Sequence, residues 1–246
     1  MKKKMIACCL IACLIVAGLV YISARNNRLD VVIKRTERLD SFEMGISTIV
    51  NLSDENIMRQ SVLDQVLTVK KRSGANMHYK VETTATISNG ENGDVTVEEN
   101  SYIYYKNNYY HSYPGVNYYG ATNKESAENN LNNIKNIISF PYEKMYDIEK
   151  VDDNVYSYKV DWKDASALLK ATLQAAVNQF ENSSFEMSDV SATIKVADGY
   201  VAEQSFFISY VGNNGEEIRM EIYTSLLDNE ASVEVPDKNK YVSIMK

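Results

Sequence analysis

The stretch MHYKVETTATI, residues 77–87, is the clearest guide to the fold of this chain. Apolar or small side chains stand at every second position, with mostly polar ones between them. The first set is Met77, Tyr79, Val81, Thr83, Ala85 and Ile87. Because successive side chains of a β-strand point to opposite faces, this period of two predicts a strand with one buried face.

Further strands follow on the C-terminal side of this stretch. The Asn- and Gly-rich loop 89–94 predicts a turn, and residues 95–105 return as a second strand. The pair Asn107-Asn108 predicts a two-residue turn with positive φ. Residues 109–119 then return again, bent at a Pro-Gly pair. These runs predict an antiparallel meander.

The same alternation extends toward both ends of the chain. Residues 42–52 alternate apolar and polar side chains and predict a half-buried strand. Residues 62–71 fit both a helix and a strand, and we interpret them as a strand because both neighbours are strands. Residues 145–149 and 155–162 predict a hairpin, and residues 190–235 predict consecutive strands.

Two segments carry helical periodicity instead. Residues 123–139 place apolar side chains on one side, and residues 164–180 carry an apolar stripe that starts after Asp164, a residue suited to an N-cap. Antiparallel strands on both sides of this helix pair predict an α+β fold. In that fold a strongly curved antiparallel sheet, a half-barrel, has the two main helices packed on its concave face.

The first 28 residues have the character of a membrane-insertion signal. Three lysines precede an apolar run from Met5 to Ile22, 18 residues without charge or proline. A helix of this length covers about 27 Å, close to the hydrocarbon thickness of a bilayer. We therefore predict an N-terminal transmembrane helix, with the N-terminus in the cytoplasm and the bulk of the chain outside.

This interpretation divides the chain into three parts: an anchor or signal segment at 1–28, a helical stalk at 29–41, and a single extracytoplasmic domain at 42–246. It makes the protein a single-pass protein of the cell membrane. Two alternatives stay open. Leu10–Cys13 resembles a lipobox, in which Cys13 would carry a lipid, and cleavage after the apolar run would give a secreted protein.

Composition narrows the classes of function. All three cysteines lie in the first 13 residues, so the remainder has no disulfide and no thiolate chemistry. All 33 Asp and Glu follow Arg28, against 21 Lys and Arg, so this part is strongly acidic. Nucleic-acid binding requires concentrated positive charge, and we expect no nucleic-acid partner.

The sequence offers no catalytic signature. Its two histidines are His78, expected to face solvent, and His111, expected to be partly covered. No Gly-rich phosphate loop, metal-binding His pair or nucleophile elbow is recognisable. Residues 152–154 fit an Asx-rich turn better than a calcium loop. We predict a non-enzymatic protein with no catalytic residue, metal or cofactor; a hydrolase that pairs two carboxylates is a third hypothesis.

Tyrosine is the residue type whose clustering suggests a binding surface. Of 18 tyrosines, eight lie between residues 102 and 119. An aromatic ring offers a flat apolar face with a polar tip, which suits sugars, peptides and lipids. Tyrosine also suits exposed strands in general. The residues that we select as ligand-binding are Tyr102, Tyr104, Tyr105, Tyr109 and Tyr110.

The run SYIYYKNNYY, residues 101–110, resembles the tyrosine-rich hairpin of exported bacterial domains of the LolA/LppX lipoprotein-carrier type and of related families of unknown function. The ending resembles them as well, because Gly199-Tyr-Val precedes two long strands and ASVEVP at 231–236. In such families a membrane-targeting N-terminus precedes an incomplete antiparallel barrel, and helices plug an apolar cavity. The resemblance implies binding of a lipid or other apolar ligand and assigns no functional residue.

Two functions follow as hypotheses. The first is a membrane-tethered, extracytoplasmic, non-enzymatic domain that binds a lipid or other apolar ligand in a half-barrel cavity. The alternative is a surface interaction or assembly module that contacts a protein partner through the tyrosine-rich hairpin.

Overall fold

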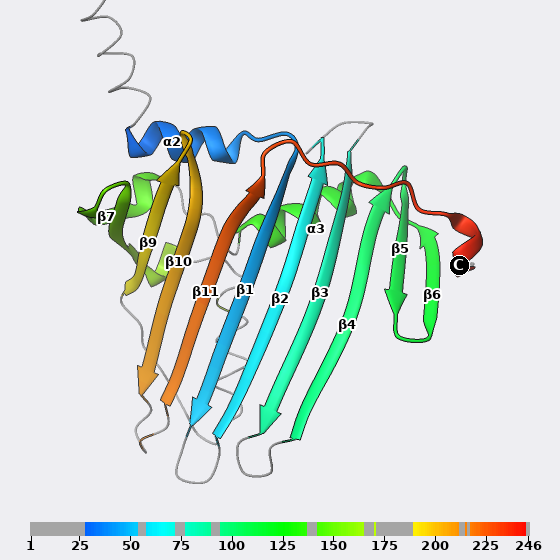
Figure 1. Ribbon diagram of the computed structural model, residues 1–246, viewed down its shortest axis with the longest axis horizontal. Coiled ribbons are helices and arrows are strands. Elements are labelled where there is room, and N and C mark those ends of the chain that lie inside the picture. Colours follow the sequence, from blue (N-terminus) through cyan, green and yellow to red (C-terminus); the bar gives the residue numbers. More distant parts are fainter. Residues whose placement is uncertain are drawn as a thin grey trace, which may run out of the picture.

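The computed structural model describes residues 28–53, 58–71, 77–89, 94–136, 142–164, 170, 189–211, 215 and 217–244. These residues form one sheet of twelve strands and two α-helices, α2 (Leu29–Glu37) and α3 (Lys124–Asn136) (Figure 1). The strands are β1 (Phe42–Ser53), β2 (Met58–Lys70), β3 (His78–Asn89), β4 (Asp94–Tyr105), β5 (Asn108–Tyr113), β6 (Val116–Ala121), β7 (Met145–Asp152), β8 (Val155–Asp161), β9 (Asp189–Ala197), β10 (Tyr200–Val211), β11 (Glu217–Asp228) and β12 (Val242–Ser243).

The predicted fold class, α+β with an N-terminal transmembrane helix, is wrong for the part of the chain that the structure describes. That part is mostly β, with one twelve-stranded sheet, and only α2 and α3 are α-helical. The prediction gave too much weight to two apolar stripes, whereas alternation governs most of the chain. Among the described residues no helix is long and apolar enough to cross a membrane.

Three of the predicted segments can be compared with the structure only in part, because some of their residues lie outside the described ones. The first predicted helix, 123–139, contains α3. The ambiguous segment 62–71 lies almost wholly in β2, which pairs with β1 on one side and β3 on the other. The predicted anchor at 1–28 and the predicted helix at 164–180 lie almost entirely outside the described residues.

Two series of hairpins make up the sheet, whose order is β12-β6-β5-β4-β3-β2-β1-β11-β10-β9-β8-β7. Neighbours are antiparallel, except that β12 runs parallel to β6. The first and eleventh strands meet in the middle, in register from Glu43 opposite Asp228 to Ser53 opposite Glu217, with one bulge. This pairing joins the two series into one sheet.

The β4–β5 turn shows how local sequence sets the register. Lys106 and Asn107 have φ values of 46° and 61°, and Tyr105 pairs with Asn108 across the turn. Two consecutive positive φ values suit a type I′ turn, whose twist matches that of the flanking strands. The turn therefore lies one residue earlier than the predicted Asn107-Asn108 turn.

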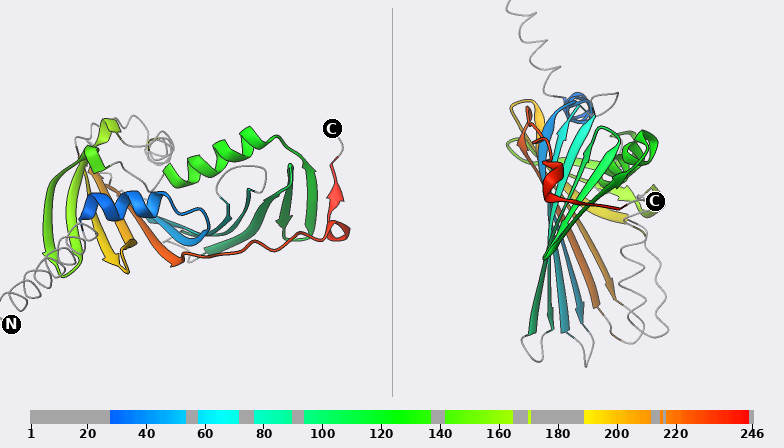
Figure 2. Two further views of the ribbon diagram at one scale, coloured as in Figure 1. Left: turned by 90° about the horizontal axis from the view of Figure 1, so that it is seen from above. Right: turned by 90° about the vertical axis from the view of Figure 1, so that its right-hand side faces the viewer.

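The sheet has two distinct faces. It is strongly twisted, and its two edges curl toward the side on which α2 and α3 lie (Figure 2). We call that side the concave face and the opposite side the outer face. The register assigns neighbouring residues to opposite faces: Phe206 and Ile222 are paired on the concave face, Phe207 and Glu221 on the outer face.

The hydrophobic core lies on the concave face. Its buried members from the sheet include Phe42, Ile46, Leu67, Tyr79, Tyr158, Ile194, Phe206, Ile208, Met220 and Ile222. Ala127 and Leu131 of α3 belong to the same cluster. Because burying one large apolar side chain contributes about 1.5–3 kcal/mol, this layer holds the helices against the sheet.

Helix α2 belongs to this core, although residues 29–41 were expected to form a stalk. Leu29, Val32 and Ile33 are buried, at the spacing of one helix face. Thr36 Oγ1 accepts a hydrogen bond of 2.8 Å from the Val201 backbone N–H at the start of β10. The helix is therefore docked on the sheet.

The C-terminal segment after β11 runs along the outer face to the far edge of the sheet (Figure 2). There the Tyr241 ring packs edge-on against Tyr110, with ring centroids 5.1 Å apart. The backbone N–H of Ile244 donates to the Tyr119 carbonyl at 2.8 Å. Tyr110 is only 2% exposed as a result of its surroundings. The segment covers the outer side of β5 and β6.

We predict that Tyr241→Ala destabilises the protein by about 1–3 kcal/mol, because it removes an aromatic partner and leaves Tyr110 poorly covered. Chemical unfolding monitored by circular dichroism measures the loss. Tyr146→Ala at the opposite edge, where the residue is 37% exposed, serves as the control and should cost less. Equal losses in the two variants would contradict the role given to the C-terminal segment.

Candidate functional site

The five tyrosines selected from the sequence do not lie on one surface. Tyr102, Tyr104 and Tyr109 are on the concave face, whereas Tyr105 and Tyr110 are on the outer face. Tyr104 and Tyr110 are almost fully buried. The alternation of a strand separates adjacent tyrosines, so a dense run in sequence becomes two smaller groups in space. Cys13, the possible lipidation site, lies outside the described residues.

The concave group is larger than the sequence suggested. It consists of seven rings from β3 to β6, which we call the aromatic strip: Tyr79, Tyr102, Tyr104, Tyr109, His111, Tyr113 and Tyr118. Strand register brings Tyr79 opposite Tyr104 and His111 opposite both Tyr102 and Tyr118. Tyr79 and His111 were missed as site residues because only this register shows that they join the group.

The strip forms a gradient from the core to solvent. Tyr79 is fully buried, the middle rings are half-buried, and Tyr113 is 41% exposed at the β5–β6 end. His111 and Tyr113 stack with ring planes 7° apart and centroids 5.9 Å apart. Tyr118 stacks on His111 at 4.9 Å and 18°. Such pairs add about 0.5–1.5 kcal/mol each beyond their burial, so the rings support one another.

Gly120 makes room for the central ring of the strip. A Cβ at this position would lie 2.7 Å from the Tyr109 hydroxyl oxygen and 2.8 Å from the adjoining ring carbon. The missing side chain therefore allows the Tyr109 ring to lie across β6. Glycine in a strand commonly marks such a close approach.

The inner end of the strip carries an unpaired polar group. Within the described part of the chain the buried Tyr79 hydroxyl has no hydrogen-bond partner of good geometry, although the Tyr102 hydroxyl and the Asn130 side chain of α3 lie near it. Burial, followed by the neighbouring Tyr102, raises the pKa of the Tyr79 hydroxyl far above its ordinary value. The group therefore stays a neutral phenol, able to donate a hydrogen bond.

Burial also affects the histidine of the strip. Enclosure by tyrosine rings lowers the pKa of His111 below its ordinary value, because the surroundings disfavour the charged form. His78, on the outer face beside Tyr105, has its pKa lowered by burial and by the charge of Lys106. Contrary to the prediction, His78 does not simply face solvent, since its Nε2 atom is buried and has no hydrogen-bond partner among the residues that the structure describes.

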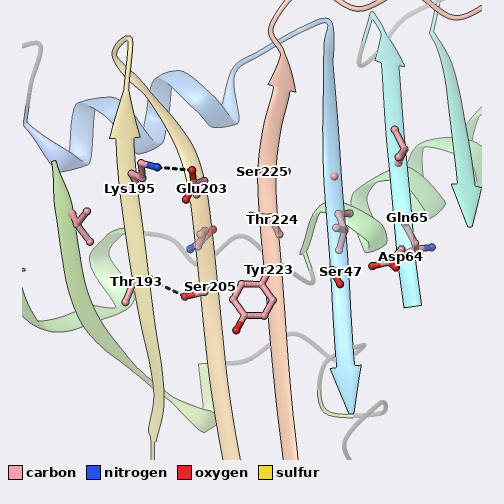
Figure 3. Close-up of a pocket in the computed structure, with 15 residues that line it drawn as sticks. Ser47, Asp64, Gln65, Thr193, Lys195, Glu203, Ser205, Tyr223, Thr224 and Ser225 are labelled. Atoms are coloured by element: carbon pink, nitrogen blue, oxygen red, sulfur yellow. Dashed lines mark hydrogen bonds and ion pairs between the residues drawn. The ribbon is translucent and has the colours of Figure 1, made fainter. Parts of the chain in front are cut away.

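A concavity of about 590 Å³ lies on the outer face over β9, β10, β11, β1 and β2 (Figure 3). Most of the residues that line it are polar by type, with Ser47, Asp64, Thr193, Lys195, Glu203, Ser205 and Tyr223 among them. Lys195 pairs with Glu203 at 2.6 Å, and the Thr193 and Ser205 hydroxyls bond at 2.7 Å. Gly45 contributes to the floor, where a Cβ would meet the Ser225 hydroxyl at 3.0 Å.

Neither concavity nor strip contains a recognisable catalytic arrangement. In the outer concavity the Lys195–Glu203 and Thr193–Ser205 pairs of β9 and β10 satisfy one another, and the hydroxyl of Tyr223, 44% exposed, donates a hydrogen bond to the Glu221 carboxylate. Within the described residues no three potential metal-ligating side chains gather. The concave face offers apolar and aromatic contact, and the outer concavity offers hydrogen-bonding side chains.

Comparison with known proteins gives few matches. No protein-family model matches the chain, and no curated protein matches it. Among solved structures the chain is similar to LprF from Mycobacterium bovis, with 10% identity and a TM-score of 0.37 over 84% of this chain and 92% of that one. It also matches the dehydratase domain from the CurK module of curacin polyketide synthase, with 13% identity and a TM-score of 0.19, covering 82% of this chain and 81% of that one.

LprF is a protein of the LolA/LppX-like lipoprotein-carrier type, the type that the tyrosine hairpin resembles. At these TM-scores the superpositions are too loose to carry a function to this chain.

The lowered pKa values of His111 and His78 predict a pH-dependent stability. Below pH about 6.5 the unfolded chain binds protons at these histidines that the folded chain does not, so stability is full above that pH and falls as the pH drops toward the lowered values. Urea unfolding at pH 7.5 and pH 5 should show a smaller difference for His78→Gln/His111→Gln than for the native protein. An unchanged difference would show that the histidines do not titrate in this way.

Gly120→Ala should destabilise the protein by about 1–3 kcal/mol, because the new methyl group displaces the Tyr109 ring. In a Tyr109→Ala background the same substitution should cost much less, since the obstructed ring is gone. Urea unfolding of the four proteins of this double-mutant cycle gives the coupling. Additive losses would contradict the contact between Gly120 and Tyr109.

Proposed function

We propose that this chain is a membrane-tethered, extracytoplasmic binding domain that holds a lipid or other apolar ligand against the concave face of its sheet. The aromatic strip forms the wall along which the ligand reaches the core. The protein acts by binding and not by catalysis.

The observation that carries the proposal is the continuity between the apolar core and the accessible end of the strip. Rings follow one another without a charged residue among them, from fully buried Tyr79 to partly exposed Tyr113. A folded core normally ends at a polar surface, so a graded apolar and aromatic path suits a ligand that is itself apolar. The curved sheet supports this role, because its edges curl around the face that carries the rings.

The strip also suggests what kind of ligand fits. Its rings present apolar faces, and its inner end presents the neutral Tyr79 hydroxyl as a hydrogen-bond donor. A buried donor without a partner costs about 1–3 kcal/mol, which a ligand carbonyl or carboxyl oxygen would recover. A long acyl chain with one oxygen-bearing end combines both features. We therefore favour a fatty acid or acyl lipid over a purely hydrocarbon ligand.

Membrane tethering belongs to the proposal through the apolar run Met5–Ile22. Such a run partitions into a bilayer, and the basic residues before it favour a cytoplasmic N-terminus. A binding domain held at the membrane would exchange apolar ligands over a short distance. Acylation at Cys13 would tether the domain as well.

The alternative, a protein-interaction module built on the tyrosine hairpin, has less support. It requires the hairpin tyrosines to be accessible together, but Tyr104 and Tyr110 are almost fully buried. Tyr105 and Tyr110 moreover lie on the face opposite the others. A partner would meet only part of the set.

A titration of the full chain with a fluorescent fatty acid tests the proposal. The neutral detergent is kept at a concentration too low to compete with the fatty acid for the protein. Saturable binding is expected, and Tyr109→Ser/Tyr118→Ser should weaken it about 5-fold or more, since two stacking surfaces at about 0.5–1.5 kcal/mol each are lost. Lipid extraction from the purified protein should recover an acyl lipid.

A matched variant controls for surface aromaticity. Phe207→Ser/Tyr223→Ser removes two partly exposed rings from the outer face and should leave fatty-acid binding within twofold. Thermal unfolding confirms that both double variants remain folded. Equal weakening by the two variants, or no saturable binding by the native chain, would refute the concave face as the binding surface.

A further inference from the structure

Helix α2 presents a second face whose composition differs from the face packed on the sheet. Val31, Lys34, Arg35 and Arg38 follow one another at the spacing i, i+3, i+4 and i+7, so they share one side of the helical segment. They line a hollow of about 510 Å³ together with Leu39, Asp40 and Tyr200. Three cations and one carboxylate give this hollow a positive balance.

The cations of the hollow are held in different ways. Arg35 donates to the Gly199 carbonyl at 3.3 Å and lies over the Tyr200 ring, 5.9 Å from its centroid. Lys34 and Arg38 are exposed, and neither forms an ion pair with any residue in the described part of the chain. One cation is therefore fixed at the wall and two remain available for an anion.

Apolar groups flank these charges. Val31 and Leu39 line the hollow at its two ends along the chain, and the Tyr200 ring adds an aromatic wall. A site for a free inorganic anion needs donors and charge but gains nothing from apolar walls. A phospholipid headgroup brings both a phosphate and the first apolar atoms of its acyl esters, and it matches the combination.

The position of α2 in the chain supports the same ligand. Six residues separate Ile22, the last of the apolar run, from Leu29, the first residue of α2. An extended chain of that length spans about 25 Å at most. If the run lies in a bilayer, the hollow is confined to the neighbourhood of the headgroups, where local concentration favours even weak binding.

The overall charge of the protein is opposite in sign to the charge of this hollow. Beyond Arg28 the chain carries 33 acidic and 21 basic residues, so most of its surface is repelled by an anionic membrane. A cationic hollow that the apolar run tethers near the bilayer would offset this repulsion at one place and orient the domain. The cations near the end of α2 also complement the helix dipole, which alone would require no ligand.

We propose that the hollow lined by Lys34, Arg35, Arg38 and Tyr200 binds the headgroup of an anionic phospholipid. The site is separate from the aromatic strip, and it uses the proposed membrane tether only to bring the headgroup near. Headgroup binding at α2 would set the orientation of the sheet relative to the bilayer.

Isothermal titration of the full chain in a neutral detergent, with three soluble probes, tests this proposal. The probes are dihexanoyl phosphatidylglycerol, dihexanoyl phosphatidylcholine and inorganic phosphate. The anionic lipid should bind, and both the zwitterionic lipid and inorganic phosphate should bind at least 10-fold more weakly than the anionic lipid. Equal binding of both lipids would overturn the charge recognition, and equally tight phosphate binding would make this a free-anion site.

Substitution locates the binding. Lys34→Gln/Arg38→Gln should weaken phosphatidylglycerol binding about 30-fold, on the basis of the contribution of each cation near anionic lipid. Lys150→Gln/Lys163→Gln changes the net charge equally at exposed residues elsewhere and should leave binding within twofold. Circular dichroism checks that the variants are folded. If the double variant does not fold, Arg38→Gln alone replaces it and should bind phosphatidylglycerol about 5-fold more weakly than the native protein.

An effect of less than twofold in the α2 variant, or an equal effect in the control, would overturn the proposal. The headgroup proposal and the fatty-acid proposal can also be refuted independently of each other. Loss of headgroup binding leaves fatty-acid binding at the strip intact, and the Tyr109→Ser/Tyr118→Ser protein should bind phosphatidylglycerol normally.

Discussion

The pairing of β1 with β11 is the contact on which the rest of the structure depends. It joins a strand that begins at Phe42 to one that ends at Asp228, and it lies at the centre of the sheet. Without it, β1 and β11 would become open edges of two smaller sheets, each with unpaired backbone groups. The pairing also brings Met220, Ile222 and Ile46 together in one core layer. Because its partners are so distant in sequence, its formation is expected to be a late and slow step of folding.

Once the central pairing is made, the alternation of strands divides the molecule into two chemical surfaces. The concave face carries the buried apolar residues and the aromatic strip, whereas the outer face carries Ser, Thr, Asp, Glu and Lys around the outer concavity of Figure 3. The C-terminal segment closes part of the outer face over Tyr110. An apolar concave face and a polar outer face thus follow from the same backbone register.

The sequence predicts features that depend on near neighbours better than features that depend on register. Alternation over 77–87 and 95–105 correctly indicates the β3–β4 hairpin, and two Asn residues indicate the turn after it to within one position. The faces of the tyrosines could not be read in the same way, since a shift of one residue moves a side chain to the opposite face. For this reason the selected set mixed concave Tyr109 with outer Tyr110.

Long-range packing accounts for the other differences. Residues 29–37 have the charge of a solvated stalk, but Leu29, Val32 and Ile33 form a stripe that β10 buries. The role of Gly120 could not be foreseen, because nothing nearby in sequence shows that the Tyr109 ring lies across it. The α+β class failed because helical stripes were counted as equal to strands, while the sheet organises most of the described chain.

The central claim is that the ligand lies against the concave face. Photo-cross-linking of a diazirine-bearing fatty acid to the full chain, followed by mass-spectrometric mapping of the adducts, tests it directly. The account predicts adducts at the aromatic strip, with Tyr109, His111 and Tyr118 modified most. Adducts confined to the outer face around Phe207 and Tyr223, or spread evenly over both faces, would contradict it.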